Sequence, residues 1–257
     1  MLSAMPSQAQ EVKASQRFAG RATTTRVSYE KSGGNKLYHG IVLTAGGLVY
    51  SGDVITPGNM FKYGALGDNI GASIALNYKL TINVYVSMRF GLQYAYLQGS
   101  NKKMVDKVNY PFHEFKSSVI EPFVGVECYP ILNYGFFVYG GFGVANSLYK
   151  NFTHQSSAEK PLYTTESTGD KVGVVPMFQF GLGYNWWLNQ DWTLGVELMG
   201  QIGMCRDGKI NVGEGTNYSI DGWPYKEAFT GNTEKKYDDA KRPDGWLQLG
   251  VVLSYHF

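Results

Sequence analysis

The chain has 257 residues, a net charge of +2, 15% aromatic residues and only 17% charged residues. It contains no apolar run of about 18 residues, which excludes a transmembrane helix, and its small net charge does not suggest nucleic-acid binding. Such a length fits one large or two modest domains. The 32 Gly and 19 Tyr residues are typical of aromatic girdles and tight interior packing in a membrane β-barrel.

The first 36 residues are expected to lie outside the folded domain. Residues 1–9 are predicted to be a signal-peptide remnant, because Ser7-Gln8-Ala9 resembles a small-x-small cleavage site. The apolar region that should precede such a site is missing, so an ordinary N-terminus is the alternative. Residues 10–36 are predicted to form a basic periplasmic tail, either a solvated linker or a segment that binds an acidic partner or lipid headgroups. The charged residues of this tail are Lys13, Arg17, Arg21, Arg26, Lys31 and Lys36, against Glu11 and Glu30.

The remaining residues, 37–257, alternate between apolar and small or polar side chains in eight segments. In the second segment, for example, Ile74, Leu76 and Tyr78 alternate with Ala75 and Asn77. A strand has a side-chain period of two, and each segment is long enough to cross a bilayer at a tilt. The chain is therefore predicted to be all-β, an eight-stranded antiparallel transmembrane β-barrel of the outer membrane. The segments are 37–50, 69–80, 84–96, 116–129, 135–148, 172–186, 192–205 and 247–257.

The connections alternate in length, which is typical of outer-membrane barrels with short periplasmic turns and long external loops. This pattern predicts that both the N- and C-termini are periplasmic. The short connections are 79–83, 130–134 and 188–191, and the long ones are 52–67, 99–115, 150–171 and 206–245.

Aromatic residues gather where the two membrane interfaces are expected, as amphipathic rings prefer headgroup depth. Pro122 lies inside a predicted strand and cannot donate to the ladder, so a bulge is expected there. The periplasmic girdle is predicted to contain Tyr78, Tyr129, Tyr134, Trp186, Trp187, Trp192 and Phe257, and the outer one Tyr50, Tyr94, Tyr96 and Tyr149.

Several polar and charged residues have the inward phase of the alternation. An eight-stranded barrel is only just wide enough to be filled by side chains. A hydrogen-bonded plug is therefore expected, in which Arg89 neutralises one or two glutamates. A conducting path or proton relay is the alternative. The inward residues are Arg89, Gln93, Glu121, Glu127, Gln179, Asn185, Glu197 and Gln201.

No catalytic, cofactor or metal site is predicted, and the chain is not expected to be an enzyme. His154-Gln155-Ser156 has the His-x-Ser spacing of outer-membrane lipid A deacylases, but it falls in a predicted polar loop, where a solvated segment explains it better. His39, His113 and His256 are scattered along the chain and form no metal-binding motif. The glycine-rich segment 139–143 lies inside a strand, unlike a nucleotide-binding loop.

The two cysteines are expected to lie at opposite rims of the barrel. Cys128 ends a strand at the periplasmic rim, whereas Cys205 ends one at the outer rim. Disulfide-bonded cysteines need Cα atoms within about 7 Å, so no intramolecular disulfide is predicted. Cys128 is expected to be a buried free thiol, with a bond to a periplasmic partner as the alternative.

Several segments resemble the small outer-membrane barrel component of the Bacteroidota type IX secretion (gliding) system. They are Leu48-Val49-Tyr50-Ser51-Gly52-Asp53, the strand pair at 70–99, and the segments at 123–127, 137–143, 180–185 and 194–198. The resemblance implies a non-enzymatic barrel that anchors a periplasmic ring, built from a lipoprotein and its partner, to the outer membrane. The candidate contacts are Arg17, Arg21 and Arg26 of the tail, and Lys79, Asn133, Tyr134, Asn189, Gln190 and Asp191 of the short turns.

Three other functions remain open at this point. The chain could be a generic small barrel with a structural or surface-interaction role, a porin-like barrel for a small molecule, or a lipid-modifying enzyme. An anchor should lose its partner when the tail is removed and tolerate trimming of residues 206–245. A surface protein should show the reverse behaviour. A transporter should respond to substitution of Arg89, Glu121 or Glu197, and an enzyme to His154→Ala.

Overall fold

The computed structural model describes residues 38–52, 57–83, 85–105, 113–131, 135–155, 163–166, 172–189, 191–204 and 244–257. Several sequence predictions fall outside these ranges and are not assessed by the structure. They concern the signal remnant, the tail with Arg17, Arg21 and Arg26, the turn residues Asn133, Tyr134 and Gln190, and Cys205.

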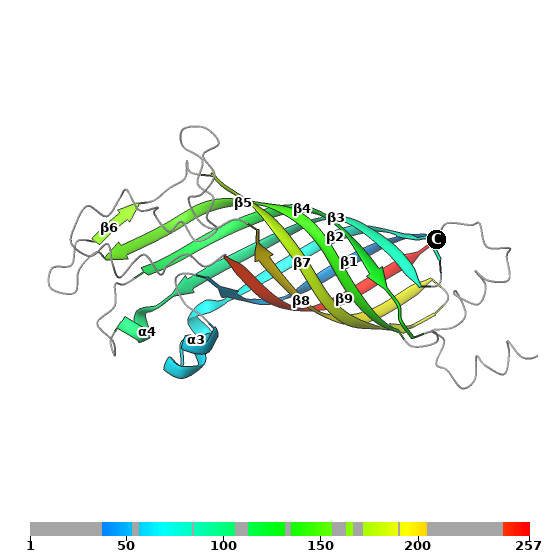
Figure 1. Ribbon diagram of the computed structural model, residues 1–257, viewed down its shortest axis with the longest axis horizontal. Helices are drawn as coiled ribbons and strands as arrows, with labels where there is room; N and C mark the ends of the chain where they lie inside the picture. The colour runs from blue at the N-terminus through cyan, green and yellow to red at the C-terminus, as the bar shows by residue number, and fades with distance from the viewer. Residues whose placement is uncertain are drawn as a thin grey trace, which may run out of the picture.

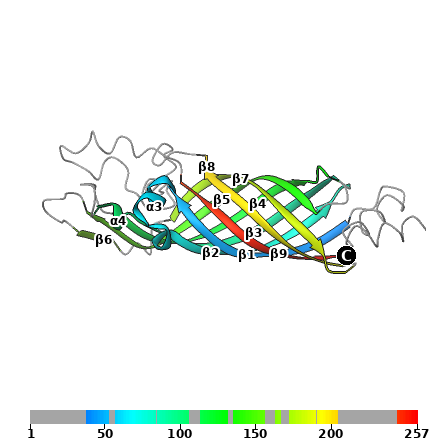
Figure 2. The same ribbon diagram turned by 90° about the horizontal axis from the view of Figure 1, so that it is seen from below.

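Eight long strands form a closed antiparallel barrel, which confirms the predicted fold (Figures 1 and 2). Around the barrel the strands follow the order β4-β3-β2-β1-β9-β8-β7-β5, and pairing between β4 and β5 closes the ring. No strand of the ring keeps an open edge, so the backbone polar groups of every strand can be satisfied on both sides. The strands are β1 (Tyr38–Ser51), β2 (Ile70–Thr81), β3 (Val86–Ser100), β4 (His113–Cys128), β5 (Phe136–Gln155), β7 (Val172–Trp187), β8 (Trp192–Gly203) and β9 (Gly245–His256).

The barrel has two unlike ends. At the turn end, where the C-terminus lies, short turns join β2 to β3 and β7 to β8 (Figure 1). At the opposite loop end lie helix α3 (Pro57–Tyr63), the 3-10 helix η1 (Leu66–Asn69), helix α4 (Lys102–Val105) and strand β6 (Tyr163–Glu166), which pairs with the end of β5. Within the described ranges, no helix has the length and apolar character needed to cross a membrane.

The outer wall of the barrel is apolar on all eight strands. Outward side chains such as Leu76 on β2, Phe142 on β5 and Leu249 on β9 are exposed by 54–64%. Their immediate neighbours along each strand are buried, because successive side chains of a strand point to opposite faces. We call this surface the outer belt. It comprises Ile41, Leu43, Ile74, Leu76, Phe90, Leu92, Tyr94, Ile120, Val124, Val126, Val138, Phe142, Val144, Phe178, Phe180, Leu182, Leu194, Val196, Leu198, Leu247, Leu249 and Val251.

Side chains fill the interior of the barrel. An apolar cluster occupies the loop end, where Met60 of α3 packs among Tyr50, Phe115 and Trp246. A smaller cluster near the turn end contains Tyr129, Phe137, Tyr139 and Met199. Buried polar and charged side chains line the inner faces of the strands along the barrel, including positions beside both clusters. The interior is therefore filled by polar and apolar side chains together.

Two of the tyrosines predicted for the aromatic girdles point inward instead. Tyr50 is fully buried and donates a hydrogen bond to Asp244 Oδ1 at 2.5 Å. Tyr129 is also buried. In β1, Tyr50 has the same phase as the inward residues Val42 and Leu48, so its place in the alternation determines its direction rather than its depth in the membrane. Tyr78, Tyr94, Trp186, Trp192 and Phe257 do lie exposed on the outer surface.

Three further predictions about the strands were wrong. Pro122 keeps the register, with Leu92 opposite it on β3, and the irregularity of β4 lies instead between Lys116 and Ser117. His154 lies in β5, opposite His113, because β5 extends further than the alternation indicated. Cys128 is a free thiol, but it is exposed on the outer wall rather than buried.

Candidate functional site

The interior of the barrel, toward its turn end, holds four charged side chains that neutralise one another. Arg89 of β3 forms ion pairs with Glu127 of β4 and, at 2.9 Å, with Glu197 of β8. Lys79 of β2 lies 2.5 Å from the second carboxylate oxygen of Glu127. All four side chains are 5% exposed or less. We call these residues the ion cluster; its two cations and two carboxylates balance, as buried charges require.

The strand register brings the ion cluster together. Lys79 is opposite Arg89 in the β2–β3 pair, and glycine is opposite Arg89 in the β3–β4 pair, at Gly125. The absent side chain at Gly125 leaves room inside the wall, and the hydroxyl end of Tyr139 fills that room. Arg89 reaches across the barrel from β3 to β8, because Glu197 has the inward phase there.

Aromatic side chains surround the ion cluster. The guanidinium carbon of Arg89 lies 5.3 Å from the ring centre of Phe137 and 5.6 Å from that of Tyr139. Tyr129 donates a hydrogen bond to Glu127 Oε2 at 2.6 Å and accepts one from Lys79 Nζ at 2.5 Å. These contacts add hydrogen bonds and aromatic packing to the ion pairs of the cluster.

A fifth buried charge-bearing residue, Glu121 of β4, stands apart from the ion cluster. Its Oε1 accepts a hydrogen bond of 2.7 Å from Gln179, whose own oxygen accepts one of 2.8 Å from Tyr139. Its other oxygen has no hydrogen-bond partner, and no ion pair joins Glu121 to any residue of the described ranges. Glu121 lies over Gly143 on the neighbouring strand, which has no side chain to displace it.

A chain of three glutamines also crosses the interior. Gln201 of β8 donates to Gln93 of β3 at 2.8 Å, and Gln93 donates to Gln248 of β9 at 2.7 Å. Because these side chains meet from opposite walls, they occupy the lumen rather than line an open path. The arrangement is that of a hydrogen-bonded plug.

The structure places all eight of the inward residues named from the sequence inside the barrel, including Arg89, Glu121, Glu127 and Glu197. The predicted list of inward residues lacks four members of the same networks, Lys79, Tyr129, Tyr139 and Gln248. All four have the inward phase of the alternation, for example Lys79 with Asn77, and Gln248 between Leu247 and Leu249. The alternation itself was the signal that could have found them.

Lys79 was expected at the periplasmic surface as a partner contact, and the structure corrects this. Its side chain is buried and bound to Glu127, so it is not available to a partner. Asn189 and Asp191 are exposed in the turn between β7 and β8. Asn189 Oδ1 accepts hydrogen bonds from the backbone N–H groups of Asp191 and Trp192, at 2.9 and 2.8 Å, and thereby shapes that turn.

No group of three or more His, Cys, Asp or Glu side chains in the described part of the chain could hold a metal ion. In the antiparallel pairing of β5 with β6, His154 lies opposite Thr164.

No protein-family model and no curated protein matches the chain. Solved structures of small barrels are similar to it in form. Ail of Yersinia pestis, in complex with the heparin analogue sucrose octasulfate, is 11% identical, with 86% of this chain and 99% of that chain covered and a TM-score of 0.39. A major outer membrane protein of Thermus thermophilus is 13% identical, with 85% and 99% covered and a TM-score of 0.44. The N-terminal β-barrel domain of Pseudomonas aeruginosa OprF is 14% identical, with 86% and 100% covered and a TM-score of 0.33. Sequence identities and TM-scores of this size carry no argument about the function of this chain.

Proposed function

We propose that this protein is a small, non-enzymatic barrel of the bacterial outer membrane, with a structural or surface-interaction role. The outer belt is the observation that carries the proposal, because it exposes large apolar side chains on every strand of the ring. A soluble protein rarely exposes an apolar patch of more than a few hundred Å². A closed barrel with a polar interior can meet hydrocarbon without leaving a backbone group unsatisfied.

The contacts across the interior favour a structural role over passage of a small molecule. Arg89 reaches from β3 to Glu197 on β8, and Gln93 meets glutamines of two other strands. A solute passing along the barrel would have to break these buried hydrogen bonds and ion pairs. Each buried charged group left without its partner costs several kcal/mol in order-of-magnitude terms.

Extraction of membranes tests the location. We expect the protein to sediment with the outer-membrane fraction and to stay there after washing with alkaline carbonate and with urea, which remove peripheral proteins. Release into the supernatant by either wash would contradict the proposal. Heating in detergent provides a control for folding, because unfolding of a closed barrel changes its migration in a gel.

A finer function, anchoring of a periplasmic type IX secretion ring, is supported by the segment resemblance at residues 48–53, 70–99 and 123–127. It is also supported by the exposure of Asn189 and Asp191 at the turn end, where a periplasmic partner would bind. Under this proposal the basic residues 10–36 and the short turns form the contact surface, and the loop end faces outward.

Crosslinking in intact cells, followed by purification in mild detergent, tests the anchor. The full chain should retain a ring-forming periplasmic lipoprotein, and a variant lacking residues 10–36 should lose it. A variant with residues 206–243 shortened serves as the matched control and should retain the lipoprotein. Failure of the full chain to retain any periplasmic partner would refute the anchor and leave the generic barrel standing.

A further inference from the structure

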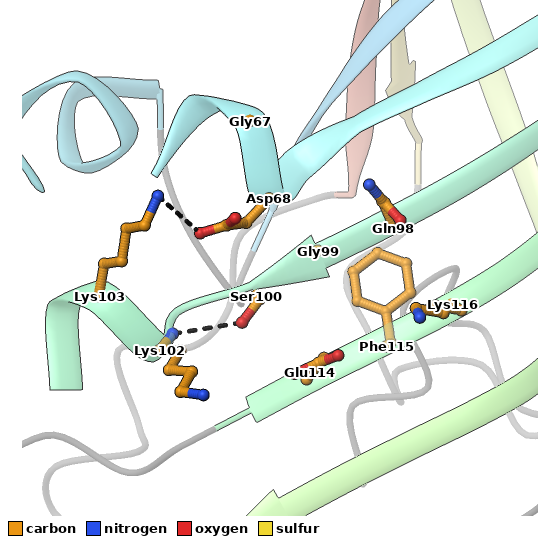
Figure 3. A pocket seen from close by; sticks show the side chains of 10 residues that line it. All are labelled: Gly67, Asp68, Gln98, Gly99, Ser100, Lys102, Lys103, Glu114, Phe115 and Lys116. Carbon is orange, nitrogen blue, oxygen red and sulfur yellow. Dashed lines mark hydrogen bonds and ion pairs between the residues drawn. The ribbon is translucent and has the colours of Figure 1, made fainter. Parts of the chain in front are cut away.

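A pocket of about 480 Å³ lies at the loop end, between β3 and β4 and next to the two short helical elements η1 and α4 (Figure 3). Lysines from α4 and β4 and carboxylates from η1 and β4 surround it. Its lining residues are Gly67, Asp68, Gln98, Gly99, Ser100, Lys102, Lys103, Glu114, Phe115 and Lys116.

The pocket borders the outer belt. The outward pairs of the β3–β4 ladder run from Tyr94 with Ile120, through Tyr96 with Ser118, to Gln98 with Lys116. Tyr94 and Ile120 are exposed by 42% and 41%. Lys116 therefore precedes Ile120, the first large apolar residue on the outward face of β4, by four residues, which is about 13 Å at a rise of about 3.3 Å per residue. The protein surface therefore changes from apolar to charged along β4. A membrane lipid changes in the same way, from its acyl chains to its charged headgroup.

The charges of the pocket are only partly compensated. Lys103 lies 3.1 Å from Asp68 Oδ2 and donates a hydrogen bond to the carbonyl oxygen of Gly64 at 3.0 Å. Lys102 and Lys116 form no ion pair with any residue in the described ranges, and neither does Glu114. Two lysines thus face the pocket against one carboxylate, which leaves an excess positive charge.

We propose that this pocket binds the phosphate headgroup of a membrane lipid, with Lys102 and Lys116 contacting the phosphate. The acyl chains would lie along the outer belt beside Tyr94 and Ile120. The inference rests on the proposed location of the barrel in a membrane. Lysine acts as a mobile point charge toward phosphate, and each basic residue near a membrane surface adds to the attraction for anionic lipid.

Glu114 provides a second, opposite test of phosphate binding in this pocket. Its carboxylate lies in the same pocket and repels a phosphate held by the two lysines. Removal of its charge should therefore tighten binding, whereas removal of the lysine charges should weaken it. A general loss of folding would weaken lipid binding in every variant. It would not strengthen binding in the Glu114 variant while weakening it in the lysine variants.

The test uses the full chain in detergent micelles, titrated with dioleoyl phosphatidic acid and followed by native mass spectrometry. Dioleoylglycerol, which has the same acyl chains without the phosphate, serves as the lipid control. We expect the double variant K102Q/K116Q to bind phosphatidic acid about tenfold more weakly. We expect E114Q to bind it more tightly. Lys62, exposed on α3 and outside the pocket, supplies the matched control K62Q, which should bind as the unchanged protein does.

Several results would overturn the proposal. They are equal binding of phosphatidic acid by the unchanged protein and by K102Q/K116Q, equal binding of dioleoylglycerol, and no tightening in E114Q. Displacement of the lipid by glycerol 3-phosphate at equal concentration would assign the pocket to a soluble phosphate instead. Gel migration before and after heating establishes that each variant is folded. The carbonate extraction is independent of the pocket, so a protein that resists extraction but binds no phosphatidic acid refutes this site alone.

Discussion

Glu121 and Glu127 lie on the same strand and point into the same barrel, yet their surroundings are opposite. Both are fully buried. Glu127 has ion pairs with Arg89 and Lys79 and a hydrogen bond from Tyr129. Glu121 has a single hydrogen bond, from Gln179, and one oxygen without any partner.

This difference shows that burial alone does not decide what a charged residue contributes to a barrel. The desolvation cost is similar for two carboxylates at equal exposure, so the partners determine whether the charge is offset. We therefore expect Glu127 to be a structural charge and Glu121 to be a group whose charge lowers stability. The following substitutions test that contrast, beginning with the largest expected effect.

Substitution of Arg89 by methionine should have the largest effect. It leaves Glu197 without its ion pair and Glu127 with Lys79 alone. Removing one partner of a buried ion pair destabilises proteins by about 3–5 kcal/mol. The free energy of unfolding, measured by urea titration in phospholipid vesicles, should fall by that amount. A decrease of less than about 1 kcal/mol would show that Arg89 is not needed to neutralise Glu127 and Glu197.

A charged residue introduced on the outer wall shows how much a charge without an ion-pair partner lowers the free energy of unfolding. Leu249 is exposed by 64% on the outer belt, and Leu249→Arg should lower the free energy of unfolding by about 2–4 kcal/mol. The control Leu249→Phe keeps the surface apolar and should have little effect in the same vesicles. Equal stability of the arginine and phenylalanine variants would mean that this wall does not face hydrocarbon.

Glu127→Gln keeps the shape of the side chain but removes its charge. Arg89 then keeps its ion pair with Glu197, while Lys79 loses its ion pair with Glu127 and keeps its hydrogen bond to Tyr129. Loss of a charged hydrogen-bond partner costs about 1–3 kcal/mol, so a decrease of that size is expected in the urea titration. An unchanged unfolding curve would contradict the structural role of this carboxylate.

Glu121→Gln should have the smallest effect. The glutamine oxygen can still accept the hydrogen bond from Gln179, and no cation loses a partner. The free energy of unfolding should change by less than about 1 kcal/mol or increase. If this variant were destabilised as much as Glu127→Gln, the contrast between the two carboxylates would be wrong, and Glu121 would have a partner that its hydrogen bonds do not reveal.

Much of the barrel could be predicted from the period-two alternation, since one wall meets apolar surroundings and the other does not. The alternation identified the eight strands and the inward direction of Arg89 and Glu197. It could not identify their pairing, because the two residues meet across the barrel only after the ring closes with its particular stagger. The residues adjacent to Arg89 and Glu197 in the sequence therefore do not predict this contact.

The predictions that failed did so where a second rule competed with the alternation. Tyr50 and Tyr129 were assigned by the preference of aromatic rings for membrane interfaces, although their phase in the strands pointed inward. Lys79 was named as a partner contact because it begins the short connection 79–83, although it also has the polar phase of its strand. The packing of Met60 from α3 among the barrel-end residues depends on tertiary contacts, which no local pattern reveals.

The most direct test of the account compares two adjacent positions on β9 at the same depth. Trp246 is buried on the inner wall, and Leu247 is exposed by 51% on the outer wall. One protein keeps Trp246 alone, with the other four tryptophans replaced by phenylalanine, and a second also carries W246F and L247W. In vesicles of brominated lipid, fluorescence should be quenched strongly at position 247 and only weakly at position 246. Equal quenching at the two positions would contradict a barrel with lipid on its outer wall and an interior filled by side chains.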